Sequence, residues 1–272
     1  MAGGFRDWKD SVAVVTGGSS GIGRGIAEAL IARGARVAIC ARDETKASRV
    51  AEEIGAWSVP VNVADQGSMA RAAQSIVDRW GKVNILCNNA GVGSMAPISR
   101  MTLADWRWML DVNLWGVIHG VTTFLPHLEA NPEGGHIVNT ASLAGLWSVP
   151  GLAAYSAAKA GVIALTETLH GELASSGSRV GASVLCPGPV TSDIKNSLRG
   201  RPKDDVGALA DVDISAVLPK EIFIDPQRCA SLVLDAIEHN HLYVLTHPEW
   251  AGSVRARMDA IEAAFARYKD IP

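Results

Sequence analysis

Residues 12–23 read V-A-V-V-T-G-G-S-S-G-I-G, and this stretch decides the fold. It begins with a valine-rich apolar run, which is typical of a strand buried inside a parallel sheet. A glycine-rich turn follows, and apolar residues then recur at helical spacing up to residue 33. A strand, a glycine turn and a helix in this order open a dinucleotide-binding unit. The spacing is G-x-x-x-G-x-G instead of G-x-G-x-x-G, so a flexible glycine turn is the alternative interpretation.

The glycine turn has the backbone features of a pyrophosphate-binding site. Gly17, Gly21 and Gly23 permit a tight turn, close approach of the pyrophosphate and close packing of the helix. The N-terminus of the helix then faces the phosphates, where its N–H groups and its dipole favour an anion. We expect the dinucleotide to contact the following residues of the turn: Gly17, Ser19, Ser20, Gly21, Ile22 and Gly23.

The end of the next apolar run, residues 36–41, bears on the choice of dinucleotide. An NAD site usually has Asp or Glu near this point to bind the ribose 2′-hydroxyl. Here Cys40 and Ala41 are followed by Arg42, whose guanidinium matches the geometry of a 2′-phosphate. This favours NADP(H) as cofactor. NAD(H) is the alternative, in which Arg42 is only a solvated loop residue.

Apolar runs and helical patterns alternate along the rest of the chain. Strands are expected at residues 12–16, 36–41, 57–61, 83–88, 135–141, 180–186 and 242–246. Helices are expected at residues 22–33, 44–54, 66–80, 103–129, 152–176 and 226–239. This alternation predicts an α/β fold, a doubly wound Rossmann-type parallel sheet with helices on both faces.

Tyr155 and Lys159 provide a candidate for proton transfer. Their spacing places a phenol and an ammonium on one face of the helix expected at residues 152–176. A free phenol has a pKa near about 10, and a neighbouring cation lowers that pKa by favouring the phenolate. Ser142, shortly upstream, offers a hydroxyl that can hold a substrate oxygen. Taken alone, Tyr-x-x-x-Lys is more often an exposed helix pair, so its weight depends on the dinucleotide motif.

Together these motifs resemble the single-domain branch of the short-chain dehydrogenase/reductase family, over about residues 10 to 245. The matching pieces are Thr16-Gly17-Gly18-Ser19-Ser20-Gly21-Ile22-Gly23, Asn88-Asn89-Ala90-Gly91, Asn113, Ser142, Tyr155, Lys159 and Pro187-Gly188. The resemblance implies the strand order 3-2-1-4-5-6-7.

The resemblance also implies the roles of the catalytic residues. Tyr155 would be the general acid in reduction and the general base in oxidation. Lys159 would lower the pKa of Tyr155 and hold the nicotinamide ribose. Ser142 would hold the substrate oxygen, and Asn113 would support a water that relays protons from Lys159.

Further cofactor contacts follow from the resemblance. Asn62 stands where relatives commonly carry Asp before Val, and Ser192 stands where many carry Thr, but an amide and a hydroxyl can still make the corresponding bonds. The expected contacts beyond the glycine turn are Arg42, Asn62, Val63, Asn89, Ala90, Gly91, Tyr155, Lys159, Pro187, Gly188, Val190 and Ser192.

Composition limits the class of protein. The chain has 272 residues, of which 48% are hydrophobic, and a formal net charge of −3, which suits one domain over residues 1–272. The slightly acidic balance and the lack of a basic run argue against a nucleic-acid partner. The four cysteines have no metal or redox spacing, and we expect no metal site. No signal peptide and no membrane-spanning stretch is expected, so a cytoplasmic location is predicted.

Two segments near the C-terminus stand apart from the α/β alternation. Residues 189–225 contain several glycines and prolines and no clear regular pattern, which predicts a lid over the substrate. Residues 248–269 have apolar side chains at helical spacing, which predicts an amphipathic helix. This helix could pack on its own subunit or on a partner.

The tryptophans suggest a pocket wall and a subunit interface. Trp147 lies between Ser142 and Tyr155 in sequence, so we expect it to line the substrate pocket, with packing as the alternative. A homotetramer is expected from the habit of the resembled family. Its interface would use apolar positions that we expect to face outward on the helix at residues 103–129: Trp106, Trp108, Trp115 and Val117.

The sequence therefore predicts an oxidoreductase that interconverts a hydrophobic secondary alcohol and its ketone with NADP(H). Ser142, Trp147 and Tyr155 are the expected substrate contacts. The same reaction with NAD(H) is one alternative. A nucleotide-binding sensor that kept the fold and lost the chemistry is another. A sugar-nucleotide epimerase is disfavoured, because the C-terminal region is too short for a separate substrate domain.

Overall fold

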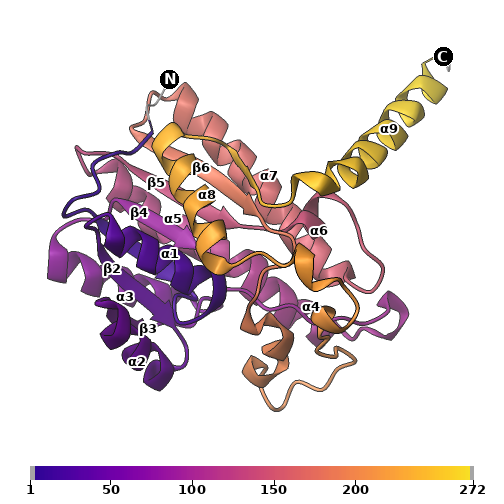
Figure 1. The fold of residues 1–272 in the computed structure, drawn as a ribbon, viewed down its shortest axis with the longest axis horizontal. Coiled ribbons are helices and arrows are strands. Elements are labelled where there is room, and N and C mark those ends of the chain that lie inside the picture. Colours follow the sequence, from indigo (N-terminus) through magenta and orange to yellow (C-terminus); the bar gives the residue numbers. More distant parts are fainter. Residues whose placement is uncertain (1–3, 270–272) are drawn as a thin grey trace.

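Seven parallel strands form the centre of the molecule in the order β3-β2-β1-β4-β5-β6-β7 (Figure 1). The computed structural model describes residues 4–269, so residues 1–3 and 270–272 of the predicted domain lie outside the described part. The order confirms the predicted doubly wound sheet. The strands are β1 (Val12–Thr16), β2 (Arg36–Ala41), β3 (Trp57–Pro60), β4 (Ile85–Asn88), β5 (Gly135–Thr140), β6 (Val180–Cys186) and β7 (Tyr243–Leu245).

Helices cover both faces of this sheet. They are α1 (Gly21–Ala32), α2 (Glu44–Ile54), α3 (Gln66–Trp80), α4 (Leu103–Leu110), α5 (Gly116–Glu129), α6 (Leu143–Leu146), α7 (Ala153–Ser175), α8 (Pro226–His239) and α9 (Ala251–Tyr268). Because helices lie on both sides, every residue of the inner strands β1, β4, β5 and β6 is buried. The edge strands β3 and β7 are partly exposed.

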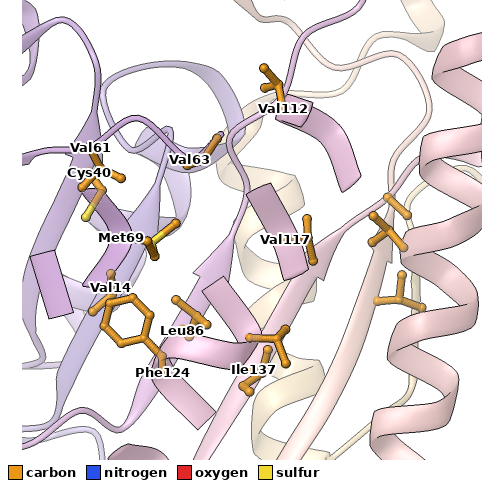
Figure 2. Close-up of a cluster of buried hydrophobic side chains, with 14 of the residues drawn as sticks. Val14, Cys40, Val61, Val63, Met69, Leu86, Val112, Val117, Phe124 and Ile137 are labelled. Atoms are coloured by element: carbon orange, nitrogen blue, oxygen red, sulfur yellow. The ribbon is translucent and has the colours of Figure 1, made fainter. Parts of the chain in front are cut away.

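The hydrophobic core has one layer on each side of the sheet. α1 and α8 pack together on one face (Figure 1). α3, α5 and α7 cover the other face, where Met69 and Phe124 pack against Val14, Leu86 and Ile137 of the strands (Figure 2). Phe124 and Met69 are fully buried, and burying an aliphatic or aromatic side chain of this size contributes about 1.5–3 kcal/mol.

Local sequence explains where several helices begin and end. Asp43 accepts a hydrogen bond from the Lys46 amide at the start of α2, and Asp65 caps α3 in the same way. Gly55 and Gly81 end these two helices with φ values of 76° and 78°, a left-handed conformation that favours glycine. These signals explain why the expected bounds of both helices match the structure.

The helix expected at residues 103–129 is interrupted. A π-helical turn, Asp111–Trp115, separates α4 from α5. Such turns shift the backbone hydrogen-bond pattern by one residue and occur frequently at functional sites. Asn113 lies in this turn and is fully buried.

The outward orientation expected for Trp108 and Val117 is wrong. Both side chains are buried in the hydrophobic core, Trp108 at 5% and Val117 at 2% exposure. Most apolar residues of α4 and α5 face the sheet and the neighbouring helices, and Trp108 and Val117 are among them, so these two positions are not available to a partner. Trp106 is partly buried, and Trp115 is 49% exposed.

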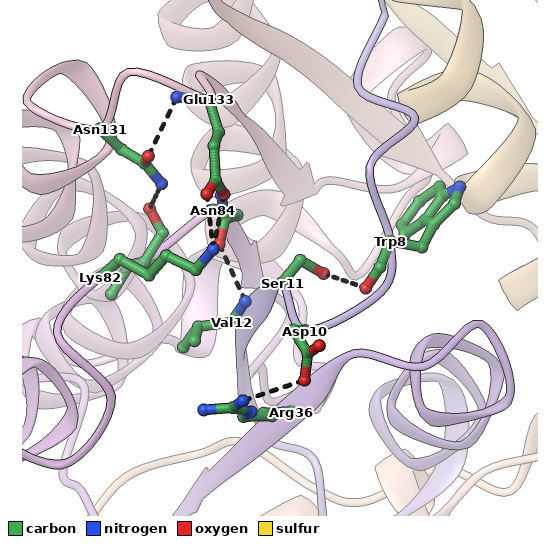
Figure 3. A network of polar contacts seen from close by, with 10 residues as sticks. Trp8, Asp10, Ser11, Val12, Arg36, Lys82, Asn84, Asn131 and Glu133 are labelled. Atoms are coloured by element: carbon green, nitrogen blue, oxygen red, sulfur yellow. Dashed lines mark hydrogen bonds and ion pairs between the residues drawn. The ribbon is translucent and has the colours of Figure 1, made fainter.

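A polar network closes the amino end of the sheet (Figure 3). Asn84, just before β4, accepts a hydrogen bond from the Val12 amide at 2.9 Å and donates one to Glu133 at 2.9 Å. Lys82 forms an ion pair with the same Glu133 at 2.6 Å. The network holds the starts of β1 and β4 together at the end of the sheet opposite the carboxyl ends of its strands.

Residues 189–225 are not the featureless stretch that their composition suggests. They include three short 3₁₀ helices at Asp193–Gly200, Ile214–Ala216 and Lys220–Ile222. An isolated bridge joins Met95 to Ala210, and a second joins Val190 to Ile224 near the two ends of the segment. The Gly93 amide also donates to the Ser197 hydroxyl at 2.8 Å. The segment is thus fastened to the body of the protein at more than one point.

The predicted C-terminal helix is present as α9, which projects away from the rest of the protein (Figure 1). None of its residues is buried. Within residues 4–269, no helix is both long enough and apolar enough to cross a membrane.

Candidate active site

A cleft of about 670 Å³ opens at the carboxyl ends of the central strands. Its walls include Gly17 after β1, Arg42 after β2, Asn89 after β4, Ala141 after β5 and Pro187 after β6. Ligands of doubly wound sheets bind at this edge, where the strand order reverses on either side of β1. The fold therefore brings the separate motifs of the sequence to one place.

The glycine turn and the start of α1 form one wall of this cleft. Gly17 has φ +68°, and a Cβ there would lie 2.9 Å from Cα of Ala90, so only glycine fits between the turn and the segment after β4. No side chain caps the first turn of α1 by a hydrogen bond, and no acidic residue lies in it. Its amides and positive dipole end are thus available to a phosphate.

The segment after β4 is fastened to this turn by Thr16. Its hydroxyl accepts hydrogen bonds from the amides of Asn89 at 2.9 Å and Ala90 at 3.0 Å. The Asn89 side chain donates back to the Thr16 carbonyl at 3.1 Å. These bonds fix the backbone of Asn89, Ala90 and Gly91 along the cleft.

A group of charged side chains lines the cleft beyond the end of β2. Arg42 donates to the carbonyl of Gly200 at 2.6 Å. Lys46, in the first turn of α2, forms an ion pair with Asp193 at 3.0 Å, and Arg199 forms a second with the same carboxylate at 3.0 Å. We call Arg42, Lys46 and Arg199 the cation cluster. Lys46 and Arg199 hold the pKa of Asp193 below its usual value, chiefly through the Lys46 hydrogen bond.

Asn113 is fixed by its side-chain amide. Its Nδ2 donates to the carbonyls of Val92 and Met109 at 3.0 Å each, and its Oδ1 accepts from the Val92 amide at 3.2 Å. The Asn113 side chain thus pairs with both the N–H and the C=O of Val92, and this links the π-helical turn to the segment after β4. A Cβ on Gly91 would lie 2.9 Å from the Asn113 Oδ1 and 3.5 Å from the Lys159 Nζ, so both polar side chains flank this glycine.

Tyr155 and Ser142 form the next pair. Ser142 caps α6 by accepting from the Ala144 amide at 3.2 Å. Burial raises the pKa of the Tyr155 phenol, and the nearby Ser142 hydroxyl opposes this rise. The net direction is upward, opposite to the lowering expected from the spacing, because burial outweighs the opposing contribution.

Lys159 is the buried cation of the site. Its side chain donates to the Thr140 carbonyl at 2.9 Å, and its Nζ lies 5.6 Å from the centre of the Tyr155 ring. The residue is 3% exposed, and burial lowers its pKa to about 8. At neutral pH the side chain is therefore mostly protonated, next to the phenol. A buried ammonium with one backbone partner has donors left for a ligand in the cleft.

The structure brings most of the expected residues to the cleft. Those that line it are Gly17, Ser19, Ser20, Gly21, Ile22, Arg42, Asn62, Val63, Asn89, Ala90, Gly91, Asn113, Tyr155, Lys159, Pro187 and Ser192. Ser142 is not part of the lining.

The other expected contacts lie outside the lining. Gly23 sits behind the turn, where a Cβ would be 2.4 Å from the Gly17 carbonyl oxygen, so it permits helix packing. Gly188 packs against His247 and hydrogen-bonds with Thr246, and Val190 is buried beside Ile224.

Trp147 does not line this cleft. Its ring meets Trp250 edge to face, with centroids 5.7 Å apart. It therefore fits the alternative packing role, which joins the segment after α6 to the start of α9.

Sequence reasoning missed Lys46, Asp193 and Arg199 as cleft residues. For Lys46 a signal was available, because Asp43 is a good helix cap and would place Lys46 in the first turn of the helix, close to Arg42. For Asp193 and Arg199 no such signal exists, since their place depends on the path of residues 189–225.

Comparisons with known proteins agree with this geometry. A model of the short chain dehydrogenase family matches residues 11–203. A Sphingobium sp. (strain SYK-6) protein named C alpha-dehydrogenase is 33% identical over 98% of this chain and 90% of its own length. A 3-oxoacyl-[acyl-carrier-protein] reductase of Synechocystis sp. is 39% identical over 70% of this chain and 78% of its own length.

A solved structure extends the comparison. A Burkholderia phymatum short chain dehydrogenase/reductase in complex with NAD has a TM-score of 0.88, with 34% identity over 95% of this chain and 96% of its own. Because the family match spans most of the chain and the relatives share its fold nearly end to end, the chain belongs to the short-chain dehydrogenase/reductase family of NAD(P)-dependent oxidoreductases.

Proposed function

We propose that this enzyme interconverts a hydrophobic secondary alcohol and its ketone with NADP(H), using Tyr155 as general acid and base. The proposal rests on the arrangement of three side chains, Ser142, Tyr155 and Lys159, near the carboxyl end of β5. The partly buried phenol of Tyr155 lies near the Ser142 hydroxyl and beside the buried ammonium of Lys159. This arrangement lies in the same cleft as the glycine turn.

The nicotinamide, when bound, supplies or accepts the hydride at the substrate carbon. The protein moves the proton. In reduction, Tyr155 gives its phenolic proton to the substrate oxygen as the carbonyl becomes a carbinol, and in oxidation the phenolate takes that proton back. Ser142 orients the substrate oxygen toward the phenol.

Lys159 stabilises the phenolate by its charge. With burial alone the phenol would titrate above its ordinary pKa, too high for exchange at neutral pH. The protonated Lys159 offsets this, because charge interactions are stronger in a buried site than in water. Asn113 fixes the segment after β4 against Lys159.

The cation cluster supports NADP(H) as the preferred cofactor. Three cations at the end of the cleft beyond β2 suit a 2′-phosphate, and Ala41 offers no carboxylate for a 2′-hydroxyl. Asp193 already occupies Lys46 and Arg199 as an anion. The solved relative in complex with NAD makes NAD(H) the alternative.

Apolar residues support a hydrophobic substrate. A Cβ on Gly93 would lie 3.1 Å from Ile194 and 3.8 Å from the Tyr155 ring, so an apolar side chain lies close to the phenol. Val92 and Val112 also line the cleft.

We also propose a homotetramer, in which exposed Leu103 and Trp115 remain as candidates for an interface.

Turnover measurements test the proposed function. The purified enzyme is assayed with NADPH and ketones, and with NADP and secondary alcohols, in parallel with the NAD(H) pair. Ser142→Ala and Tyr155→Phe serve as chemical controls, and Thr122→Ala, on an exposed helix position, serves as the matched surface control. Turnover that is lost in the first two variants and kept in the third supports the proposal. Cofactor binding without turnover on any carbonyl or alcohol would favour a sensor.

A further inference from the structure

α9 has no buried face within residues 4–269. The helix has 18 residues, none of them buried, and it projects from the body of the protein (Figure 1). Most helical stability in proteins comes from packing an apolar face and not from the intrinsic helix propensity of the residues. A projecting helix of this kind therefore needs a surface to cover it.

The large apolar side chains of α9 form a single stripe with a seven-residue repeat. They are Val254, Met258, Ile261, Phe265 and Tyr268, and Ala251 extends the stripe by one step, so that successive positions alternate in steps of three and four. Met258, Ile261, Phe265 and Tyr268 are between 39% and 77% exposed. Steps of three and four are the pattern of a two-helix coiled-coil seam.

We propose that α9 pairs in antiparallel orientation with α9 of a second copy of this chain. In the register centred between residues 259 and 260, Met258 of one helix faces Ile261 of the other. In the same register, each large aromatic meets a small residue: Phe265 faces Val254, and Tyr268 faces Ala251. Large side chains opposite small ones fill the seam without a cavity or a clash.

The charges beside the stripe agree with this register. Antiparallel pairing brings Arg255 of one copy next to Glu262 of the other, twice by symmetry. The opposite flank carries Arg257 and Ala264, so no like charges face each other there. Arg257 is already bound within its own subunit, where it donates to the Leu146 carbonyl at 2.7 Å.

The pairing would reach the neighbourhood of the active site. The tip of the second helix, with its Phe265 and Tyr268, would cover Ala251 and Val254 at the base of the first. That base adjoins Trp250, which packs on Trp147 and so on the end of α6, the helix capped by Ser142. The second copy would thus hold the segment that carries Ser142.

Sedimentation velocity on the full chain tests the pairing. Phe265→Asp places a charge in the seam, and Ala263→Asp places the same charge on the exposed opposite side of α9 as the control. We expect the first variant to assemble with half the number of subunits of the native protein, and the second to be unchanged. Equal assembly of all three proteins, or a monomeric native protein, would overturn the proposal.

A charge exchange tests the register. Arg255→Glu and Glu262→Arg, each alone, should weaken assembly at least several-fold in dissociation constant. The double variant should recover it, because the two exchanged side chains would again face opposite charges. Failure of the double variant to recover assembly would overturn the antiparallel register. Binding of a monomeric native protein to phosphatidylglycerol vesicles would instead identify a membrane surface as the occupant.

Discussion

The two ends of the cleft are built in opposite ways. At the end near Tyr155, the polar side chains of Asn113, Ser142 and Lys159 are buried, and each is hydrogen-bonded to backbone groups of the central elements. At the end near Arg42, the polar side chains are charged and carried by a loop, a helix start and residues 189–225. The first end is fixed by the fold, whereas the second depends on ion pairs.

This difference has energetic consequences. The Lys46, Asp193 and Arg199 side chains are 27%, 44% and 59% exposed, and exposed ion pairs contribute only about 0.2–1 kcal/mol each. Residues 193–200 can therefore exchange partners at small cost when a ligand phosphate arrives. Buried polar groups cannot do so, because losing a partner leaves them unsatisfied. Catalysis needs fixed groups of the buried kind, and ligand entry needs the exchangeable contacts of the exposed end.

The largest effect is expected at the fixed end. Tyr155→Phe removes the phenolic proton and keeps the ring, so kcat should fall by about 10²–10⁴-fold, the usual contribution of a proton-transfer group. The dissociation constant of the cofactor should change little. Steady-state kinetics and cofactor titration check this, and a variant with more than a tenth of native kcat would remove Tyr155 from the mechanism.

Residues 189–225 are also held by a buried ion pair, which differs from the exposed ion pairs of the cation cluster. Asp105 is fully buried and pairs with Arg201, whose side chain is 7% exposed, at 2.5 Å. Burial would raise the pKa of Asp105, but hydrogen bonds from the Ala208 and Thr102 amides and from Arg201 lower it to about 2. Asp105→Asn should lower the free energy of unfolding at pH 7 by about 3 kcal/mol, because it leaves a buried charge unpaired.

The pH dependence provides the control for that variant. A carboxylate whose pKa is lowered by folding stabilises the folded state at pH values above the pKa that it has in the unfolded chain, about 4. This stabilisation is lost as the pH falls toward about 2, the pKa of Asp105 in the folded protein. The native protein should therefore lose stability over this range, and Asp105→Asn should lose less. Parallel denaturant titrations at several pH values would show the difference. Identical pH profiles would mean that Asp105 is not the group that titrates.

Lys159→Met should have the next largest effect, about 10–100-fold on kcat/KM. The native lysine has a pKa of about 8, so it is charged at neutral pH, and in the proposed mechanism this charge favours the Tyr155 phenolate. Without this charge, the acidic limb of the alcohol-oxidation profile, where activity falls as the Tyr155 phenolate is protonated, should move to higher pH. Cofactor affinity should also fall, because Lys159 is expected to hold the nicotinamide ribose. A profile that does not move would separate Lys159 from the proton transfer.

The sequence was sufficient for the fold and for the fixed end of the cleft, since both depend on local patterns. The strand at residues 12–16 with its glycine turn, and the Tyr155–Lys159 spacing, are set by neighbours in the chain. The strand order is confirmed, and the glycine turn, Tyr155 and Lys159 all line the same cleft. The π-helical turn at Asn113 has no recognised sequence pattern, so a continuous helix was expected there.

The exposed end could not be predicted, because its contacts join distant parts of the chain. Lys46 and Asp193 are 147 residues apart, and exposed ion pairs leave no periodic pattern in a sequence. Trp147 illustrates the same limit. Its place between Ser142 and Tyr155 suggested a pocket wall, but its actual neighbour is Trp250.

Arg42→Ala should act at the exposed end and on one cofactor. Loss of a charge-assisted contact to the 2′-phosphate should raise the KM for NADP(H) about tenfold, with little change for NAD(H). Adding Ala41→Asp should move the preference further toward NAD(H), since a carboxylate there can bind the 2′-hydroxyl. The ratio of the two specificity constants measures this. Equal losses for both cofactors would show that Arg42 takes no part in the choice.

Asp193→Asn should have the smallest effect, and that effect is on NADP binding. It tests most directly whether the exposed end of the cleft differs from the buried end. Asp193 is the anion that occupies Lys46 and Arg199, so a 2′-phosphate must compete with it. Removing its charge should tighten NADP binding by about 2–5-fold, the value of an exposed ion pair, and should leave NAD binding unchanged. The gain should shrink as salt is raised, because exposed charges are screened.

Asp213→Asn is the matched control, since it breaks the ion pair with Lys195 in the same segment, and neither residue lines the cleft. Weaker NADP binding in Asp193→Asn would mean that the carboxylate positions the two cations for the phosphate. The exposed end would then be preorganised in the same way as the buried one.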